Sequence, residues 1–575
     1  MKKTLQYLKP YRGTVAAGLI LKFIGSVAEL FLPLLLEYII NDVAINPALS
    51  SESKIRMLVY LGIGMFVCAL TALFGNIFAN RLTVRSSGNM THDLRYDLFS
   101  KTCYLSSRQV DSFGTPSLIS RLTSDSYYVN QMVARTLRLG VRAPILILGG
   151  IILAFTRDVA LACVLLACLP LVGVTIYLIT KKGVPVYYGV QKKQDGMVRD
   201  VQENVTGVRV IKALDKGEYE TKKFEGLVND LAAQEYKANR IMSLSNPLAS
   251  FILNVGLVAV IVVGALRGTK SGTVLAFLQY FVIILNAMIA LTKIFIVISR
   301  GSASAARIEK VLEMDVSEKL EESDENDADD YKIEFKNVCF SYNGVKDNLK
   351  NVNFGVCAGQ TLGIIGATGS GKSTIVNLMM RFYDVREGEI LVDGKNVKSY
   401  TSKELRGKFG AAFQNDFLMS ASVRENVDYG RNLTDEQINA AIDDAQAREF
   451  VDGLEGGLDF NLAQKASNLS GGQKQRLLIA RALAGSPEII VLDDSSSALD
   501  YATDAALRRA LAKGYANATK VIVAQRISSI KNADLILVLE DGEVIGKGKH
   551  EELMRSCDEY ALIYSAQMGG EDGEA

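Results

Sequence analysis

Six long apolar runs in the first 300 residues constrain the fold of this chain more than any other feature. They lie near residues 15–40, 57–80, 139–156, 159–181, 247–267 and 273–298. A helix of about 20 apolar residues crosses the roughly 30 Å of hydrocarbon in a bilayer, and each run can supply such a helix. The chain has 575 residues, of which 49% are hydrophobic. A membrane-embedded first half is therefore expected.

The connections between these runs differ in length and charge. Residues 157–158 and 267–272 are short links, whereas 81–138 and 182–246 are long, rich in Lys and Arg, and have apolar residues at helical spacing. Positive charge beside the spans places the long connections and both chain ends in the cytoplasm. Met1–Arg12 is basic with one apolar face, which favours an interfacial helix over a cleavable signal peptide, because the apolar stretch continues to Ile40.

Several polar side chains fall within the proposed spans. An ionisable group facing lipid is costly, so each either lines a cavity or pairs with a neighbouring helix, and the sequence leaves both readings open. These residues are Lys22, Glu29, Glu37 and Lys293. A second set on the sixth span could line a substrate path or simply pack helices: Gln279, Tyr280, Asn286 and Met288.

An acidic, polar run, Ser317–Asp330, separates the apolar half from the remainder. From Tyr331 onward short apolar strands alternate with polar turns and amphipathic segments, which predicts an α/β domain. The predicted domains are therefore residues 1–313 in the membrane, an acidic linker over 314–330, an α/β domain over 331–570, and a polar tail over 571–575. With 64 basic and 63 acidic side chains, overall charge gives no indication of nucleic-acid binding.

One glycine-rich stretch of the second half carries recognisable chemistry. It follows the apolar run Thr361–Ile365 and precedes a helical segment, as a phosphate-binding loop requires. The backbone N–H groups of such a loop surround phosphates at a helix N-terminus. Lys372 reaches the β and γ phosphates and Ser373 reaches Mg²⁺. The candidate ATP-binding residues here are Gly366, Thr368, Gly369, Ser370, Gly371, Lys372, Ser373 and Thr374.

A second anion-binding stretch, Leu469-Ser470-Gly471-Gly472-Gln473, opens another helix about a hundred residues later. A strand ending in Asp493 follows it. Together these motifs resemble the ATP-binding cassette (ABC) transporters, in which the phosphate loop of one nucleotide domain and the signature sequence of another close on the same ATP. The resemblance extends over nearly the whole chain. It implies an exporter-type half-transporter: six membrane helices with long cytoplasmic helical loops, followed by one nucleotide-binding domain.

The resemblance also assigns roles to particular residues. Tyr342 resembles the aromatic residue that stacks on adenine, and Gln414 resembles the loop glutamine that touches Mg²⁺, which is also held by Ser373 and Asp493. Residues expected to serve the opposite nucleotide are Ser470, Gly471, Gly472, Gln473 and Asp500. The ranges Asp111–Asp125 and Asn204–Phe224 resemble the loops whose short coupling helices rest on the nucleotide domains.

Two catalytic positions depart from the family pattern. Asp494 stands where efficient members have a glutamate base, and its carboxylate is one methylene shorter. Gln525 stands where the family has a histidine, and glutamine cannot titrate near neutrality. His550 lies beyond the next strand and cannot replace it. The segment Gln464–Asn468 also departs from the pattern that usually precedes the signature. Losing a positioned base costs typically 10²- to 10⁴-fold, so this site is expected to hold ATP but split it slowly.

The resemblance therefore implies the degenerate-site subunit of a heterodimeric bacterial exporter in the cytoplasmic membrane. The expected partner is a homologous half-transporter carrying the glutamate and histidine, and the expected cargo is an amphipathic drug-like molecule, lipid or peptide, with multidrug export as the commonest label. Lipid surrounds the spans, and no nucleic acid is expected. Alternatives are a homodimeric exporter with two slow sites, an ATP-gated regulatory or binding membrane protein, and uptake on the same fold.

Overall fold

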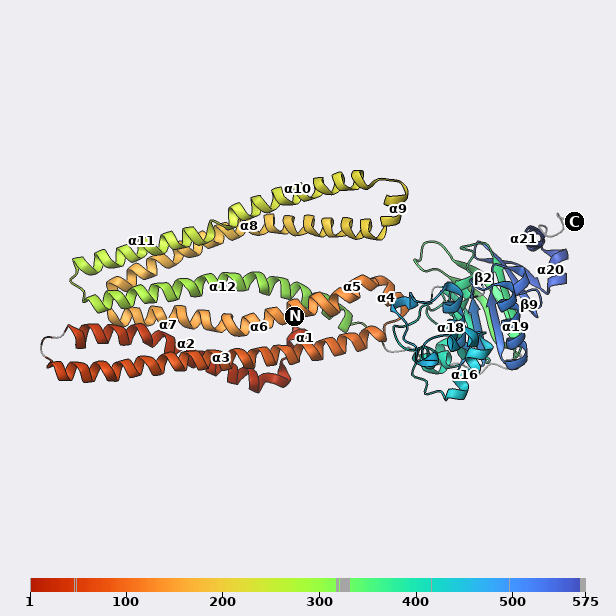
Figure 1. Cartoon of the computed structure of the whole chain (residues 1–575), viewed down its shortest axis with the longest axis horizontal. Helices are drawn as coiled ribbons and strands as arrows, with labels where there is room; N and C mark the ends of the chain where they lie inside the picture. Colours follow the sequence, from red (N-terminus) through yellow and green to blue (C-terminus); the bar gives the residue numbers. More distant parts are fainter. Residues whose placement is uncertain are drawn as a thin grey trace. The chain divides into compact units, whose positions relative to one another are not determined.

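The computed structural model describes residues 2–45, 47, 49–316, 320, 331–414, 416–495 and 497–568. The chain forms two compact units: Met1–Tyr104 with Phe113–Met314, and Leu105–Ser112 with Asp315–Ala575 (Figure 1). Most of the acidic run predicted as a linker, and the whole of the predicted tail, lie outside the described residues.

The described residues of the first unit form helices joined by short turns. Six of its helical stretches are long and apolar enough to cross a bilayer, so the six predicted spans are confirmed. Its elements are α1 (Lys2–Gln6), η1 (Lys9–Tyr11), α2 (Arg12–Tyr38), the π-helix η2 (Ile39–Ala44), α3 (Ser51–Cys103), α5 (Thr115–Ser120), η3 (Arg121–Asp125), α6 (Ser126–Arg135), η4 (Thr136–Gly140), α7 (Val141–Arg157), α8 (Val159–Thr206), α9 (Val208–Ala213), α10 (Gly217–Met242), α11 (Ser245–Leu266) and α12 (Ser271–Leu312). The helix α4 (Ser107–Phe113) belongs to the second unit except for its last residue.

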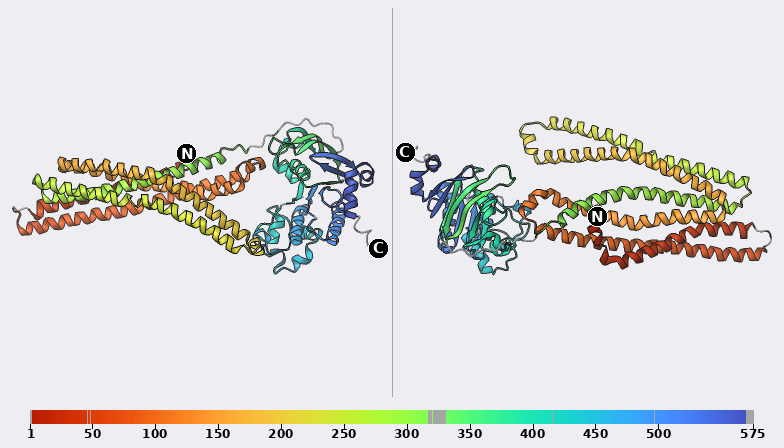
Figure 2. Two further views of the ribbon diagram at one scale, coloured as in Figure 1. Left: turned by 90° about the horizontal axis from the view of Figure 1, so that it is seen from above. Right: turned by 180° about the vertical axis from the view of Figure 1, so that it is seen from behind.

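The long connections are helical, as predicted, and they continue the helices of the spans. Helix α3 has 53 residues, which at 1.5 Å per residue is about 80 Å, more than twice the thickness of the hydrocarbon. Helices α8 and α10 run beside each other, and α9 joins the C-terminal end of α8 to the N-terminal end of α10 (Figure 2). The short helices α5 and α9 fall within the two ranges expected to carry coupling helices.

The polar residues of the spans have partners within the unit. Lys22 Nζ donates to Asn80 Oδ1 at 3.1 Å, Arg142 donates to both oxygens of Glu29, and Thr273 Oγ1 donates to Glu37 at 2.8 Å. Tyr280 is fully buried and its hydroxyl donates to the Leu30 carbonyl at 3.1 Å, so it packs helices. Gln279 and Asn286 are exposed on α12 and Met288 is half-buried, whereas the side chain of Lys293 is outside what the structure describes.

The second unit is built on a six-stranded sheet with the order β10-β9-β3-β8-β7-β6. Its strands are β3 (Thr361–Gly366), β6 (Phe409–Ala412), β7 (Ile489–Asp493), β8 (Thr519–Val523), β9 (Leu535–Glu540) and β10 (Glu543–Gly548). Neighbouring pairs are parallel except β9–β10. A four-stranded antiparallel sheet contains β1 (Tyr331–Phe340), β2 (Leu349–Cys357), β4 (Glu387–Val392) and β5 (Lys395–Asn396).

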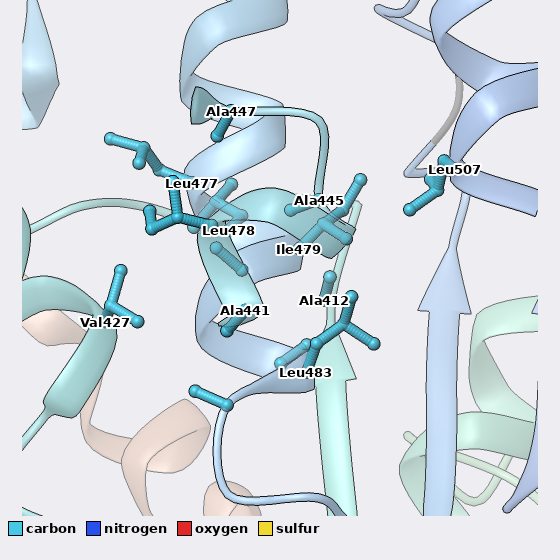
Figure 3. Close-up of a cluster of buried hydrophobic side chains, with 14 of the residues drawn as sticks. Ala412, Val427, Ala441, Ala445, Ala447, Leu477, Leu478, Ile479, Leu483 and Leu507 are labelled. Carbon is cyan, nitrogen blue, oxygen red and sulfur yellow. The ribbon is translucent and has the colours of Figure 1, made fainter. Parts of the chain in front are cut away.

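Helices cover the main sheet and bury its apolar side chains. Helix α18 (Gly471–Leu483) places Leu478 and Leu483 in a cluster with Ala412 of β6 and with Ala441 of α16 (Asp435–Asp444) (Figure 3). The other helices of the unit are α13 (Lys372–Met379), η5 (Val397–Ser399), α14 (Ser402–Gly407), α15 (Val423–Asp428), α17 (Arg448–Asp452), η6 (Gly457–Asp459), η7 (Gln464–Ala466), α19 (Tyr501–Gly514), η8 (Ile527–Ser529), α20 (His550–Ser556) and α21 (Asp558–Met568).

The parallel order positions the site. The strands β3, β8, β7 and β6 all end at the same edge of the sheet, because parallel strands share a direction. The phosphate loop follows β3, Asp494 follows β7, Gln525 follows β8 and Gln414 follows β6. Residues that are far apart in the sequence therefore meet at one edge.

Candidate nucleotide-binding and hydrolytic site

The loop between β3 and α13 has the backbone that close approach to phosphate requires. Gly366 and Gly371 have φ of 152° and 103°, and Gly371 caps the N-terminus of α13 in the left-handed region. A Cβ on Gly366 would lie 2.1 Å from the carbonyl oxygen of Leu539. Any larger residue at 366 would thus displace the loop from the sheet.

The Lys372 side chain folds back over this loop. Its Nζ donates to the carbonyl oxygens of Gly366 at 2.9 Å and Ala367 at 2.7 Å. Burial lowers the pKa of Lys372, while the carboxylates of Asp493 and Asp494 act in the opposite direction. The ammonium group is therefore held inside the loop, where phosphate oxygens can replace the two carbonyl contacts.

Two polar atoms beside the loop are buried without a protein partner among the described residues: Ser370 Oγ and Asp493 Oδ1. The Asp493 carboxylate is 3% exposed and is hydrogen-bonded by the Ser373 hydroxyl. Burial raises the pKa of Asp493, and the Ser373 bond opposes that shift. Oxygen ligands of this kind suit Mg²⁺ bound together with substrate phosphates, so Ser373 and Asp493 fit the predicted ion. Mg²⁺ supplies charge neutralisation at the phosphates when it is bound.

The residue after β7 lies at the centre of a three-residue arrangement. Asp494 Oδ2 accepts a hydrogen bond from Gln525 Nε2 at 2.7 Å and another from Gln414 Nε2 at 3.3 Å. Its backbone has φ of 50°, and its N–H donates to the carbonyl of Val523 at 2.9 Å. Burial raises the pKa of the Asp494 carboxyl, and the bonds from Gln525 and Gln414 oppose that rise.

This arrangement limits the chemistry of the site. The two departures predicted separately, Asp494 and Gln525, contact each other directly. The Gln525 amide donates to the carboxylate, and it can neither gain nor lose a proton near neutral pH. The same carboxylate oxygen accepts both glutamine bonds, which leaves it less available to a water molecule. The arrangement therefore consists of one carboxylate, Asp494, hydrogen-bonded by two amide side chains that do not titrate near neutral pH.

Tyr342 is 40% exposed and is held by the helix that follows the phosphate loop. Its hydroxyl lies 3.4 Å from Thr374 Oγ1 and accepts a bond from Asn377 Nδ2 at 3.2 Å. The rings of Phe340 and Tyr383 meet it edge-on, with centroids 4.7 and 4.9 Å away. Such contacts fix the ring while part of its surface remains accessible, as base stacking requires.

The contribution of Asn377 was missed by sequence reasoning. Asn377 lies three residues after Thr374 on α13, so both side chains project from the same side of the helix. Both residues contact the Tyr342 hydroxyl. The three-residue spacing from Thr374 was the sequence feature that could have indicated a role for Asn377.

The signature stretch is a capped helix N-terminus separate from this group of contacts. Ser470 Oγ accepts from the backbone N–H of Gln473 at 3.3 Å, and Gln473 Oε1 accepts from the N–H of Ser470 at 2.9 Å. This reciprocal capping satisfies amide groups at the start of α18 and leaves Ser470 and Gly471 exposed. A Cβ on Gly472 would lie 3.2 Å from the Ala498 carbonyl oxygen.

Asp500 caps the next helix in a similar way. Its carboxylate accepts from the backbone N–H and the hydroxyl of Thr503, at 2.8 and 3.0 Å. These bonds, the backbone one first, lower the pKa of Asp500. Asp500 therefore has a structural role as a helix cap, and any contact with the nucleotide of the opposite domain would be a second role.

Comparisons with known proteins cover both units. Residues 15–288 match the family model described as the ABC transporter transmembrane region, and residues 349–497 match the model described as ABC transporter. The uncharacterized ABC transporter ATP-binding protein YfiB of Bacillus subtilis is 34% identical over 581 aligned residues, which span 100% of both chains.

Two further matches extend over almost the full length. The ATP-dependent lipid A-core flippase of Vibrio cholerae is 29% identical over 575 residues, covering 99% of this chain and 97% of the flippase. A solved bacterial Atm1-family ABC exporter with ATP bound superimposes with a TM-score of 0.82, covering 97% of this chain and 98% of the other at 21% identity. The likeness thus includes the order of both units.

Proposed function

This chain belongs to the ABC transporter family, and on that premise we propose that it is one half of a heterodimeric exporter whose own nucleotide site holds ATP and splits it slowly. The protein is a multi-pass membrane protein with an exporter-type membrane domain and an ATPase domain, and its family drives transport with ATP. The partner would be a homologous half-transporter with a glutamate and a histidine at the two altered positions.

The contact between Gln525 and Asp494 carries this function. Hydrolysis needs a carboxylate positioned on the attacking water and a second group that stabilises the charge forming on the γ-phosphate. Here the carboxylate is the shorter Asp494, and the second group is an amide that points at Asp494 from 2.7 Å. Binding depends on other residues, namely the phosphate loop and Asp493, and these match the family pattern.

The residues divide the work between two nucleotides. Lys372 and the loop amides bind the phosphates of the ATP at this chain's own site, and Tyr342 stacks on its base. The exposed start of α18, with Ser470 and Gly471, completes the site on the partner's phosphate loop. ATP binding closes the two nucleotide domains and turns the membrane cavity outward, and hydrolysis at the partner's site resets it.

We propose that the cargo is an amphipathic molecule. Export from within a membrane suits a molecule that partitions into the bilayer, and one full-length relative is named for flipping a lipid. Drug-like compounds and peptides with an apolar portion belong to the same physical class.

The decisive experiment is the intact mass of the complex purified through a tag on this chain, combined with ATP-driven flux in vesicles. We expect two different chains in equal amounts, together with flux of an amphipathic dye that stops when ATP is omitted. A single mass of twice this chain would overturn the heterodimer in favour of two slow sites. An intact complex that binds ATP without any flux would overturn export in favour of a regulatory membrane protein.

A further inference from the structure

A polar cluster lies between three membrane helices of the first unit. Lys22, Ser26 and Glu29 project from one face of α2, since they are four and three residues apart. Asn76 and Asn80 face them from α3, also four residues apart. The third side consists of basic residues around the start of α7, namely Arg138 in η4 and Arg142 in α7.

Helices α2 and α3 are tightly packed beside this cluster. A Cβ on Gly75 would lie 3.2 Å from the Cα of Gly25, and one on Gly25 would lie 3.3 Å from the backbone nitrogen of Asn76. Close contact of small residues brings the backbones of α2 and α3 together at this level. The polar side chains are therefore held in place on either side of a rigid contact.

Positive charge exceeds negative charge in the cluster. Lys22 is 4% exposed, and its hydrogen-bond partner, Asn80, is neutral. Arg142 pairs with Glu29 at 2.7 Å. The guanidinium groups of Arg142 and Arg138 both repel the Lys22 ammonium, and Glu29 attracts it. Three cations thus surround one carboxylate in a region of low dielectric, where an uncompensated charge is costly.

Several hydrogen-bonding atoms of the cluster have no protein partner among the described residues. They include Ser26 Oγ, on a fully buried residue, Asn76 Oδ1 and Arg142 Nε. Arg138 Nε donates to the Ala134 carbonyl of the preceding helix α6 at 3.3 Å, which is long for a hydrogen bond. The Ser26 hydroxyl and the Arg142 N–H are donors, and donors beside excess positive charge favour an oxyanion.

We propose that this cluster binds the phosphate-type anionic head group of an amphipathic cargo. Lys22 and Glu29 lie about 10 and 20 Å along the helix from the start of the apolar run 15–40, and hence inside that span, whereas Arg138 directly precedes the run 139–156. A ligand reaching this depth must combine an anionic group with an apolar body. The assignment rests on the proposed export function, since it names the chemical class of the cargo.

Binding without ATP tests the site directly. The purified complex in neutral detergent is titrated calorimetrically with dioctanoyl phosphatidic acid, with dioctanoyl phosphatidylcholine, and with glycerol 3-phosphate. We expect the first to bind roughly tenfold or more tightly than each of the others, because charge-assisted bonds and an apolar tail act together. Equal binding of the two lipids would overturn the anion site. Equal binding of glycerol 3-phosphate would replace the lipid head group by free phosphate and so overturn an amphipathic ligand.

Substitutions then locate the site. Lys22→Gln and Arg138→Gln should each weaken phosphatidic acid binding by roughly tenfold, whereas Lys22→Arg should retain it. The matched control is Lys181→Gln, which removes an exposed cation of α8. Size-exclusion profiles and ATP binding verify that each variant is folded. Folded Lys22→Gln and Arg138→Gln complexes with unchanged affinity would overturn the assignment.

A flux measurement separates this inference from the transport function. Complexes in phosphatidylcholine vesicles receive ATP and either a tail-labelled phosphatidylglycerol or a tail-labelled phosphatidylcholine. Selective movement of the anionic lipid supports the anionic cargo, and equal movement of both overturns it while transport stands. Selective binding without any ATP-driven movement supports the anion site and overturns export.

Discussion

The nucleotide site has a phosphate-binding side and a hydrolytic side, and the two differ in which of their polar groups are free to meet a ligand. On the phosphate side, the glycines allow the tight loop, Lys372 is held within it, and Asp493 and Ser370 have buried oxygens with no protein partner among the described residues. On the hydrolytic side, Asp494 is engaged by Gln525 and Gln414. Binding and splitting of ATP depend on separate groups, so one can be preserved while the other is weakened. This difference is the basis for our proposal of a site that uses ATP occupancy more than ATP turnover.

The largest expected effect comes from restoring the hydrolytic side. Asp494→Glu combined with Gln525→His should raise turnover at this site by about 10²-fold, because a positioned base contributes typically 10²- to 10⁴-fold. The measurement is ATPase activity of the assembled complex in which the partner's catalytic glutamate is replaced by glutamine. Unchanged turnover would show that the two sides do not differ in the way described.

Damage to the phosphate side should affect binding instead. Lys372→Ala removes the ammonium held over the loop and should weaken ATP binding at this site by roughly 10- to 100-fold, since hydrogen bonds to charged groups contribute about 1.5 to 3 kcal/mol each. Photolabelling of this chain with azido-ATP measures the effect. The control is Lys513→Ala on the exposed face of α19. Equal labelling of the two variants would contradict the role of Lys372.

A smaller effect is expected at the adenine end. Tyr342→Ala should weaken ATP binding by roughly five- to tenfold, because base stacking on an aromatic ring is worth about 1 to 3 kcal/mol. Tyr342→Phe keeps the ring and loses only the contacts of the hydroxyl with Thr374 and Asn377. The phenylalanine variant should therefore bind close to normally. If both variants bind equally poorly, the hydroxyl contacts matter more than stacking.

The smallest effect is a change in pH dependence. Burial raises the pKa of Asp494, and the Gln525 bond lowers it again. Gln525→Leu removes that bond, so the pKa should rise further and the ionised base should be lost at a higher pH. In a plot of residual ATP turnover against pH, the fall in turnover on the acidic side should consequently occur at a higher pH. Gln191→Leu, on the exposed surface of α8, is the control and should leave the pH of this fall unchanged. A fall at the same pH for Gln525→Leu would argue against Asp494 as the titrating group.

Sequence reasoning was most successful where local chemistry determines structure. The six spans follow from runs of apolar residues, and the phosphate loop follows from glycines at positions that have positive φ. It also predicted that Asp494 and Gln525 depart from the family pattern. The bond between them was not predicted, because it depends on β7 and β8 lying side by side, and that order is set by tertiary packing.

The membrane unit was less predictable for a related reason. Lys22 and Glu29 were identified as costly residues, but their partners Asn80 and Arg142 are 58 and 113 residues away. Helical periodicity states which face a residue occupies and not which helix covers that face. Tyr280 was left open between lining a path and packing, and the Leu30 carbonyl that accepts its hydroxyl favours packing.

The most direct measurement of the difference between the two sides is the chemical state of the nucleotide retained at this site. The assembled complex is loaded with radiolabelled ATP, chased with unlabelled ATP, and quenched over time, with this chain's site identified by photo-crosslinking through Tyr342. We expect the retained label to remain ATP over many turnovers of the partner's site. Rapid conversion of the retained label to ADP would contradict the account, because Asp494 would then be a fully competent base.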